Sequence, residues 1–150
     1  MSIYQELQRD HDDLRDMIAA INKLPGSAKG SKQRLFEKLK VALTDHARAE
    51  EAVFYEAIMG DEKARHMALE GHEEHHVIDL LLAEIVALSP DEEAWDAKFE
   101  VLRENVEHHL EEEEDDLFKK ARQILSSVEA DRLGARFKME KDKIAVSLML

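Results

Sequence analysis

The sequence contains no cysteine among its 150 residues. Disulfide bonds, thiolate metal ligands and thiol nucleophiles are therefore excluded, and any metal site must use nitrogen and oxygen ligands. Only 5 glycines and 2 prolines interrupt the chain, whereas charged residues make up 37% of it and hydrophobic residues 44%. This composition favours long helices over a sheet, and the length suits one domain with a substantial core.

Long hydrophobic runs and positive charge are also scarce. No uninterrupted apolar stretch is long enough to span a bilayer, and the N-terminus lacks the basic start and apolar run of a signal peptide. We therefore expect a soluble cytoplasmic protein with no membrane partner. The formal net charge of −13 argues against nucleic acid as a partner, because a phosphate backbone would be repelled, but it is compatible with the attraction of cations.

Two histidines and one glutamate recur in each half of the chain with nearly the same spacing. In both halves the glutamate follows the second histidine by four residues, and the two histidines are 35 or 34 residues apart. The six residues are His11, His46 and Glu50 in the first half and His75, His109 and Glu113 in the second. Because residues i and i+4 lie on one helix face, each His-x-x-x-Glu pair presents an imidazole and a carboxylate to one point. The repeat therefore predicts a metal site.

The spacing of apolar residues predicts four long helices joined by short connections. We expect them over about residues 2–24, 32–59, 62–88 and 89–125. Two similar hairpins related by an approximate twofold axis would give an all-α, antiparallel up-down-up-down four-helix bundle over residues 1–125. Ser126 and Glu129 form a capping box that opens an additional C-terminal helix over residues 126–150. This helix is expected to pack on the bundle or to contact a second copy or another protein.

Helix lengths indicate that the histidines lie at one level of the bundle. His46 and His75 are 14 and 15 residues from the turn predicted at Gly60, a likely helix C-cap, so each lies about 21 Å from it. The last connection fits less well, because His109 follows the helix-start signal at Ser89 by 20 residues. Either this helix starts later than its capping signal or its first turn overhangs the bundle.

The predicted ligands interrupt apolar helix faces. Beyond Glu50 the inward face is expected to continue through Val53 and Ala57, and beyond Glu113 through Leu117 and Ile124. A charged carboxylate on such a face costs several kcal/mol unless it is paired. Bound cations would remove that cost, and mixed imidazole and carboxylate ligation without sulfur suits iron or manganese.

With these motifs the sequence resembles the hemerythrin-like (HHE cation-binding) domain family. The motifs that carry the resemblance are Asp10-His11, His46-Ala47-Arg48-Ala49-Glu50-Glu51, Glu74-His75-His76 and His108-His109-Leu110-Glu111-Glu112-Glu113-Glu114. The resemblance implies a non-heme di-iron centre in which Glu50 and Glu113 bridge two iron ions and the four repeated histidines are terminal ligands. It also implies that an oxo or hydroxo group can bridge the irons, with manganese or zinc as substitutes.

The chain departs from the oxygen-carrying members of that family. Those members have a further histidine four residues before the ligand of the third helix and an acid five residues after the last histidine. Here Gly71 stands four residues before His75, and Glu113 follows the last histidine by four. These departures argue against reversible oxygen carriage. His72, one turn before His75, is an optional fifth histidine ligand.

The sequence thus predicts a di-iron protein that binds or reacts with dioxygen, peroxide or nitric oxide, in oxygen or iron sensing or in oxidative-stress defence. Whether it is an enzyme, for example one that decomposes peroxide, stays open. One alternative is a metal store or ferroxidase of ferritin-like type, which needs two Glu-x-x-His helices, and only Glu73 with His76 supplies that spacing. Another is a helical interaction module with a structural metal. His66, His76 and His108 are expected on the surface.

Overall fold

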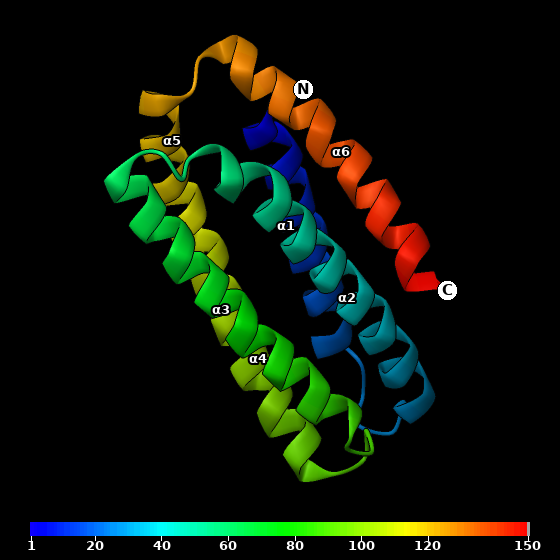
Figure 1. Cartoon of the computed structure of the whole chain (residues 1–150). Coiled ribbons are helices and arrows are strands. Elements are labelled where there is room, and N and C mark those ends of the chain that lie inside the picture. Colours follow the sequence, from blue (N-terminus) through cyan, green and yellow to red (C-terminus); the bar gives the residue numbers. More distant parts are fainter. Residues whose placement is uncertain (150) are drawn as a thin grey trace.

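The computed structural model describes residues 1–149, and every regular element within that range is helical (Figure 1). The elements are α1 (Ile3–Asn22), α2 (Lys29–Glu50), the π-helical turn η1 (Glu51–Tyr55), α3 (Glu62–Val86), α4 (Glu93–Glu112), the π-helical turn η2 (Glu113–Leu117), α5 (Phe118–Ile124) and α6 (Ser127–Met149). α2 continues through η1, and α4 continues through η2 into α5. The predicted all-α, antiparallel four-helix bundle with an additional C-terminal helix is confirmed.

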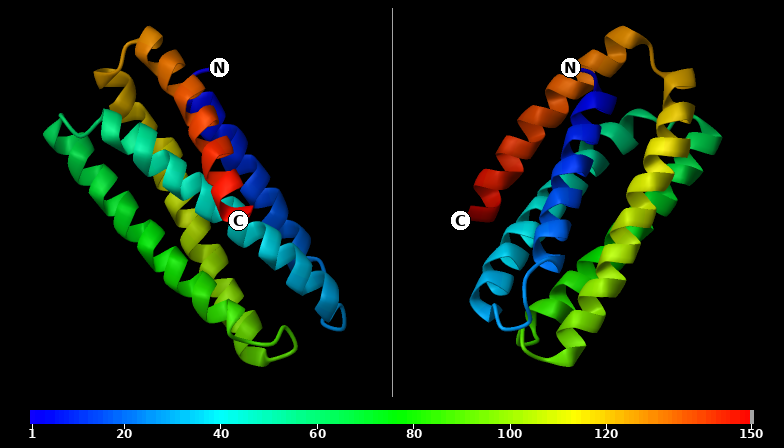
Figure 2. Two further views of the ribbon diagram at one scale, coloured as in Figure 1. Left: turned by 45° about the vertical axis from the view of Figure 1, so that its right-hand side comes forward. Right: turned by 180° about the vertical axis from the view of Figure 1, so that it is seen from behind.

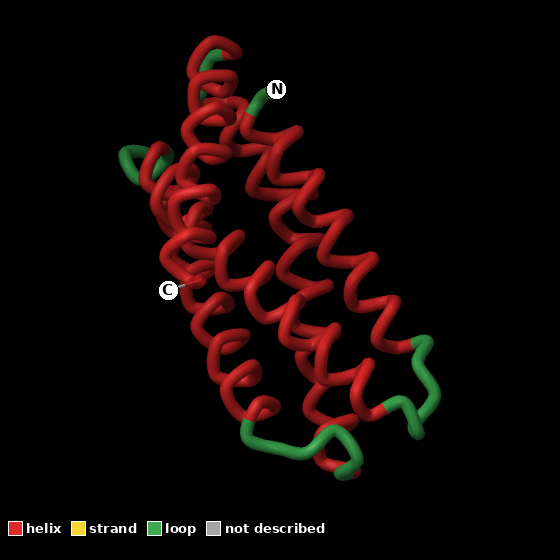
Figure 3. Tube along the Cα trace, turned by 90° about the vertical axis from the view of Figure 1, so that its right-hand side faces the viewer, coloured by secondary structure: helices red, strands yellow, loops and turns green. Residues whose placement is uncertain are grey.

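The bundle consists of two hairpins, with α1 beside α2 and α3 beside α4. The connections between the helices lie at the two ends of the bundle (Figure 3). α6 runs along α1 and α2, on the side away from α3 and α4 (Figure 2). One half of the bundle therefore has an extra covering helix that the other half lacks. Leu150, the last residue of the predicted C-terminal helix, lies outside the described residues.

α6 approaches the start of the chain very closely. A Cβ atom added at Gly134 would lie 2.2 Å from the carbonyl oxygen of Met1, so a larger residue would push α6 away from α1. Leu133 and Phe137 of α6 are buried on either side of this contact. None of the helices within residues 1–149 combines the length and hydropathy that a bilayer crossing requires.

Capping boxes form at the starts of α1 and α6; the one at Ser126 was predicted, and the one at Ser2 was not. The Ser2 hydroxyl accepts a hydrogen bond from the backbone N–H of Gln5 at 3.3 Å, and the backbone N–H of Ser2 donates to the Gln5 side-chain oxygen at 2.9 Å. Ser126 and Glu129 make the same reciprocal pair, with both distances 3.1 Å, at the start of α6. These bonds satisfy N–H groups that have no partner within the helix.

Other predicted helix ends were wrong by a few residues. α2 begins at Lys29, three residues before the predicted start, and α4 begins at Glu93, after the capping signal at Ser89. The backbone N–H of Ser89 donates to the Glu92 carboxylate at 2.8 Å, so the capping bond forms in a turn before the helix. The late start resolves the misfit of the last connection. Gly60 lies in the turn before α3 without a positive φ, so it is not a left-handed cap.

The two π-helical turns follow the repeated glutamates and were not predicted. A π turn winds one extra residue into the helix, which rotates every later side chain relative to the bundle axis. Consequently the inward face after η1 continues at Ile58 instead of the predicted Ala57. After η2 it continues at Ala121, and the predicted Ile124 is only half-buried. The residues Val53 and Leu117 are buried as predicted.

The apolar core is divided into two clusters by a polar layer. One cluster, around Leu7, Phe54 and Phe137, fills the end where α6 begins, and the other, around Leu39 and Leu102, fills the opposite end. The buried histidines and glutamates of the repeat lie between them. Charged groups therefore occupy the centre of the bundle, flanked by hydrophobic side chains along its axis.

Candidate metal centre

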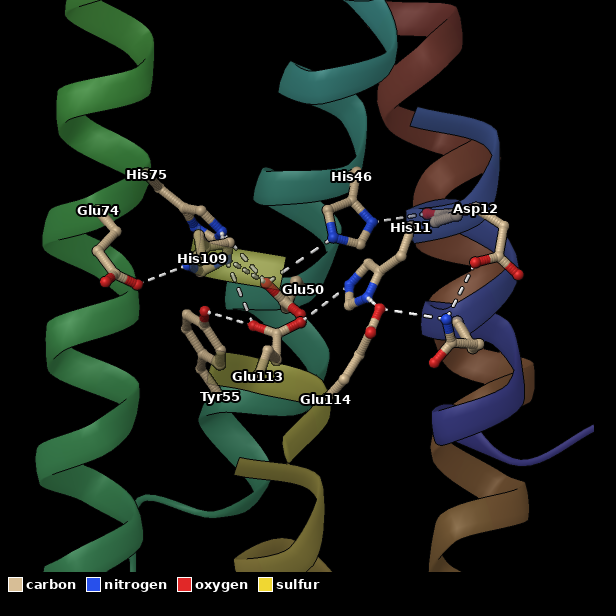
Figure 4. A network of polar contacts seen from close by, with 12 residues as sticks. His11, Asp12, His46, Glu50, Tyr55, Glu74, His75, His109, Glu113 and Glu114 are labelled. Atoms are coloured by element: carbon tan, nitrogen blue, oxygen red, sulfur yellow. Dashed lines mark hydrogen bonds and ion pairs between the residues drawn. The ribbon is translucent and has the colours of Figure 1, made fainter. Parts of the chain in front are cut away.

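The structure brings the six repeated residues together at one level of the bundle (Figure 4). The six side chains come from the four helices of the bundle. None of them is more than 4% exposed. We call this set the central cluster: His11 on α1, His46 and Glu50 on α2, His75 on α3, His109 on α4 and Glu113 on η2. The predicted level arrangement of the four histidines is thus realised.

The ligand atoms of the central cluster form two groups that share Glu50. Within each group the nitrogen and oxygen atoms lie within 4.8 Å of one another. The groups are His11, His46, Glu50 and Glu113, and Glu50, His75 and His109. Glu113 also faces both sides, with Oε1 3.1 Å from His11 Nε2 and Oε2 3.4 Å from His109 Nε2. Two carboxylates between two pairs of imidazoles suit two adjacent cations.

Several atoms of the central cluster lack hydrogen-bond partners. Among the described residues, neither oxygen of Glu50 forms a hydrogen bond, and the Nε2 atom of His46 forms none either. Glu50 Oε1 lies 3.2 Å from His75 Nε2, but not in hydrogen-bonding geometry. Because an unpaired buried carboxylate is costly, these atoms need a partner that side chains do not supply. A divalent cation that accepts nitrogen and oxygen ligands fits this requirement.

A second layer of carboxylates holds the outer nitrogen of every histidine in the central cluster. We call these four residues the outer carboxylates. Their distances to the Nδ1 atoms are 2.7 Å for Asp10 to His46, 2.7 Å for Glu51 to His75, 2.6 Å for Glu74 to His109 and 2.7 Å for Glu114 to His11. A carboxylate accepting from Nδ1–H leaves the lone pair of Nε2 directed inward, as a metal ligand requires.

Sequence reasoning did not assign roles to the outer carboxylates, although the repeat contains them. Asp10 and Glu74 directly precede the first histidine of each half, and Glu51 and Glu114 directly follow the repeated glutamate. The pairings obey the same approximate twofold symmetry as the ligands. Acidic residues at matching repeat positions were therefore the signal that could have identified them.

Hydrogen bonds to carboxylates raise the pKa values of three buried histidines. Burial alone would lower the pKa of His11, but its bonds to Glu113 and Glu114 outweigh burial and raise that pKa to about 9. The pKa of His75 and that of His109 are raised in the same way, by the nearby charge of Glu50 together with a hydrogen bond to Glu51 or Glu74. Metal-free protein therefore holds protons where a cation would bind.

Tyr55, on η1, completes one side of the central cluster. Its hydroxyl donates to Glu113 Oε2 at 3.0 Å, and its ring stacks on that of His75 with a centroid distance of 5.6 Å. Burial and the charges of Glu113 and Glu50 raise the pKa of Tyr55 well above its usual value, so the phenol stays protonated. A Cβ atom at Gly71 would lie 2.3 Å from this hydroxyl, so only glycine leaves room for Tyr55 here.

Gly71→Ala is expected to destabilise the protein by about 1–3 kcal/mol, because the added methyl overlaps the Tyr55 ring and hydroxyl. Urea denaturation measures this change. Gly60→Ala is the matched control, since nothing lies within 4 Å of a Cβ at that position. Adding Tyr55→Phe to Gly71→Ala should recover part of the loss. Equal stability of the two alanine variants would show that Tyr55 does not occupy this space.

The remaining histidines lie outside the central cluster. His72 is 57% exposed, and its Nδ1 atom is 3.3 Å from Glu51. His66, His76 and His108 are exposed, as predicted, and Glu73 is exposed as well. The single Glu-x-x-His spacing of the sequence thus does not contribute to the buried site.

Comparisons with known proteins agree with this geometry. Residues 2–121 match the profile described as the Hemerythrin HHE cation binding domain. The chain is 28% identical over 149 residues to a protein from Nostoc sp. described as a DNA nickase, and the match covers 96% of this chain but 40% of that relative. The fold is similar to the crystal structure of a hemerythrin HHE cation-binding domain-containing protein from Mycobacterium kansasii. The TM-score is 0.87 at 20% identity, over 99% of this chain and 90% of the other.

Proposed function

This chain belongs to the hemerythrin HHE cation-binding domain family, and we propose that its central cluster holds two iron ions that bind or react with dioxygen, peroxide or nitric oxide. The observation that carries the proposal is the placement of Glu50 in both ligand groups, with neither of its oxygens hydrogen bonded among the described residues. Bound iron would supply the electrons for such reactions. The protein orients the ligands, keeps bulk water out and controls protons at the site.

The imidazole rings and the Tyr55 hydroxyl hold the protons beside the central cluster. Each outer carboxylate fixes one imidazole through its Nδ1–H group, which raises the basicity of the inward nitrogen. Tyr55 presents a protonated hydroxyl, 3.0 Å from Glu113, at the edge of the central cluster. This hydroxyl can donate a hydrogen bond to Glu113 or to a small oxidant beside it.

A cavity of about 70 Å³ leads from solvent to the central cluster between α3 and α4. We call it the side cavity; its lining includes Tyr55, Gly71, His109 and Glu113. A cavity of this size holds a few water molecules, so it has room for dioxygen, nitric oxide or hydrogen peroxide. On the opposite side α6 covers the cluster, with the buried Phe137 ring 6.0 Å from that of His46. Small oxidants therefore approach from the α3 and α4 side.

Anaerobic loading with Fe²⁺ followed by optical spectroscopy tests this function. Dioxygen, peroxide and nitric oxide are added in turn to the loaded protein, and metal-free protein treated in the same way is the control. We expect new visible bands with at least one oxidant and only in the loaded protein. If the spectrum of the loaded protein does not change with any of the three oxidants, the metal is structural and the protein is a helical interaction module.

The third-helix ligand is expected to be His75 and not His76. His75 is buried 3.1 Å from His109 Nε2, whereas His76 is exposed. His75→Ala should lose the iron-dependent spectrum, and His76→Ala, a matched control one residue away, should keep it. His72→Ala should retain both irons and change only the rate of reaction with oxidants. Iron content that falls in His76→Ala but not in His75→Ala would contradict the assignment.

The other candidate functions receive less support. A ferritin-like site would use Glu73 and His76, which are exposed and away from the central cluster. The chain spans 40% of the length of the curated relative described as a DNA nickase. A net charge of −13 opposes binding of a phosphate backbone, so we propose no action on DNA by this chain.

A further inference from the structure

Three of the four outer carboxylates are neutralised by a basic side chain. The ion pairs are Lys141 with Asp10 at 2.5 Å, Arg48 with Glu51 at 3.3 Å and Arg15 with Glu114 at 2.8 Å. Within residues 1–149, no lysine or arginine forms an ion pair with the fourth outer carboxylate, Glu74. One position in the layer around the central cluster therefore lacks its positive charge.

The twofold symmetry of the repeat explains where this charge is missing. Glu74 is the repeat counterpart of Asp10, whose partner Lys141 is supplied by α6. α6 packs on α1, α2 and η1, so within residues 1–149 the α3 and α4 side has no helix in the equivalent place. The position that corresponds to the Lys141 ammonium thus lies at the surface, next to Glu74.

Two side chains of α4 of types able to ligate a metal, His108 and Glu112, lie beside Glu74. Glu74, His108 and Glu112 each offer one ligand atom, and the three atoms lie within 4.8 Å of one another. We call these residues the mouth cluster. His108 Nε2 is 3.3 Å from Glu112 Oε1, and the three side chains are 31%, 67% and 45% exposed in sequence order. Two carboxylates so close repel each other, and a cation between them removes that repulsion.

The mouth cluster is connected to the central cluster. Glu74 and Glu112 line the side cavity together with His109 and Glu113. Glu74 also accepts the hydrogen bond from His109 Nδ1 at 2.6 Å, so one carboxylate belongs to both clusters. Further carboxylates on the cavity wall, Glu70 and Asp116, add negative charge that raises the local concentration of cations.

We propose that Glu74, His108 and Glu112 form an entrance site for a divalent cation of the Fe²⁺ or Mn²⁺ class, which passes from there through the side cavity to the central cluster. Three protein ligands leave the other coordination positions to water, so the ion is held weakly and exchanges fast. Delivery rests on the proposed function of the central cluster, whereas cation binding at the mouth cluster does not.

Titration of metal-free protein with Mn²⁺, followed by electron paramagnetic resonance of the free ion, tests the binding step. The variant is His108→Ala combined with Glu112→Gln, which spares Glu74 and the central cluster. His66→Ala is the matched control, because His66 is an exposed histidine paired with a glutamate four residues on, at 3.0 Å, without a third ligand. Wild type and control should bind one weak Mn²⁺ beyond the tightly held ions, and the double variant should bind that ion at least about tenfold more weakly.

Stopped-flow loading with Fe²⁺ tests delivery. The double variant should reach the same final iron content as wild type, with a loading rate reduced at least about fivefold, and His66→Ala should load at the wild-type rate. If wild type binds the tightly held ions but no additional weak ion, the entrance site is wrong and the proposed function of the central cluster is unaffected. A weak ion without tight ones would support a mouth-cluster cation and overturn delivery together with the proposed function. Unchanged loading in the double variant would overturn delivery alone.

Discussion

Glu50→Ala is expected to abolish binding of both metal ions, with the loss of all metal-dependent stabilisation. Glu50 is fully buried, belongs to both ligand groups, and has no hydrogen bond among the described residues that the substitution would break. Its removal takes one ligand from each cation at once. Metal analysis after anaerobic loading and gel filtration measures the content, and thermal unfolding with and without metal measures the stabilisation.

Glu56→Ala provides the matched control, because Glu56 lies on the same continuous helix, just after η1, and its side chain is exposed. It should keep wild-type metal content and the full metal-dependent rise in melting temperature. Glu113→Ala should remove at least one ion, because Glu113 lies in one group and faces His109 of the other. Far-UV circular dichroism checks that each variant stays helical. A Glu50→Ala protein that retains two ions would contradict a shared carboxylate.

Metal-free protein is expected to lose stability between pH 6.5 and about pH 9, whereas metal affinity should rise over the same range. The pKa of His11 is raised to about 9 in the folded protein, so its stabilising protonation is complete below the unfolded value of 6.5 and is lost as the pH approaches 9. A shift of this size corresponds to about 3 kcal/mol. The raised pKa values of His75 and His109 act in the same direction.

A bound cation reverses the sign of this pH dependence. Imidazoles must be deprotonated to ligate, so protons compete with the metal throughout this window, and the metal wins progressively as the pH rises. Urea denaturation from pH 6.5 to 9, with chelator or with added Zn²⁺, measures both slopes. His11→Gln should flatten the metal-free slope, and His76→Ala should leave it unchanged. Metal-free stability that increases with pH would show that the folded histidines do not hold extra protons.

The sequence was sufficient to predict the bundle and the residues that meet at its centre. Matching offsets from His11 to His46 and from His75 to His109 required two similar hairpins, and equal distances from the turns required one level. The late start of α4 could not be predicted, because Ser89 forms its capping bond in a turn and not at the helix start. Tertiary packing decides between these two uses of one local signal.

The π turns and the outer carboxylates escaped prediction for a different reason. A single extra residue in a helical turn leaves no mark in composition or apolar spacing, so the shift from Ala57 to Ile58 is visible only once the helix is built. Glu114 lies in the acidic run from Glu111 to Asp116, where solvated residues are the rule. Its bond to His11 depends on contacts between helices that are far apart in the sequence.

Anaerobic titration of metal-free protein with Fe²⁺, with Mössbauer spectroscopy of the product before and after oxidation, tests the central claim most directly. We expect two iron ions per chain that are magnetically coupled after oxidation, because Glu50 belongs to both ligand groups and Glu113 faces a histidine of each. One iron per chain, or two irons without coupling, would contradict it.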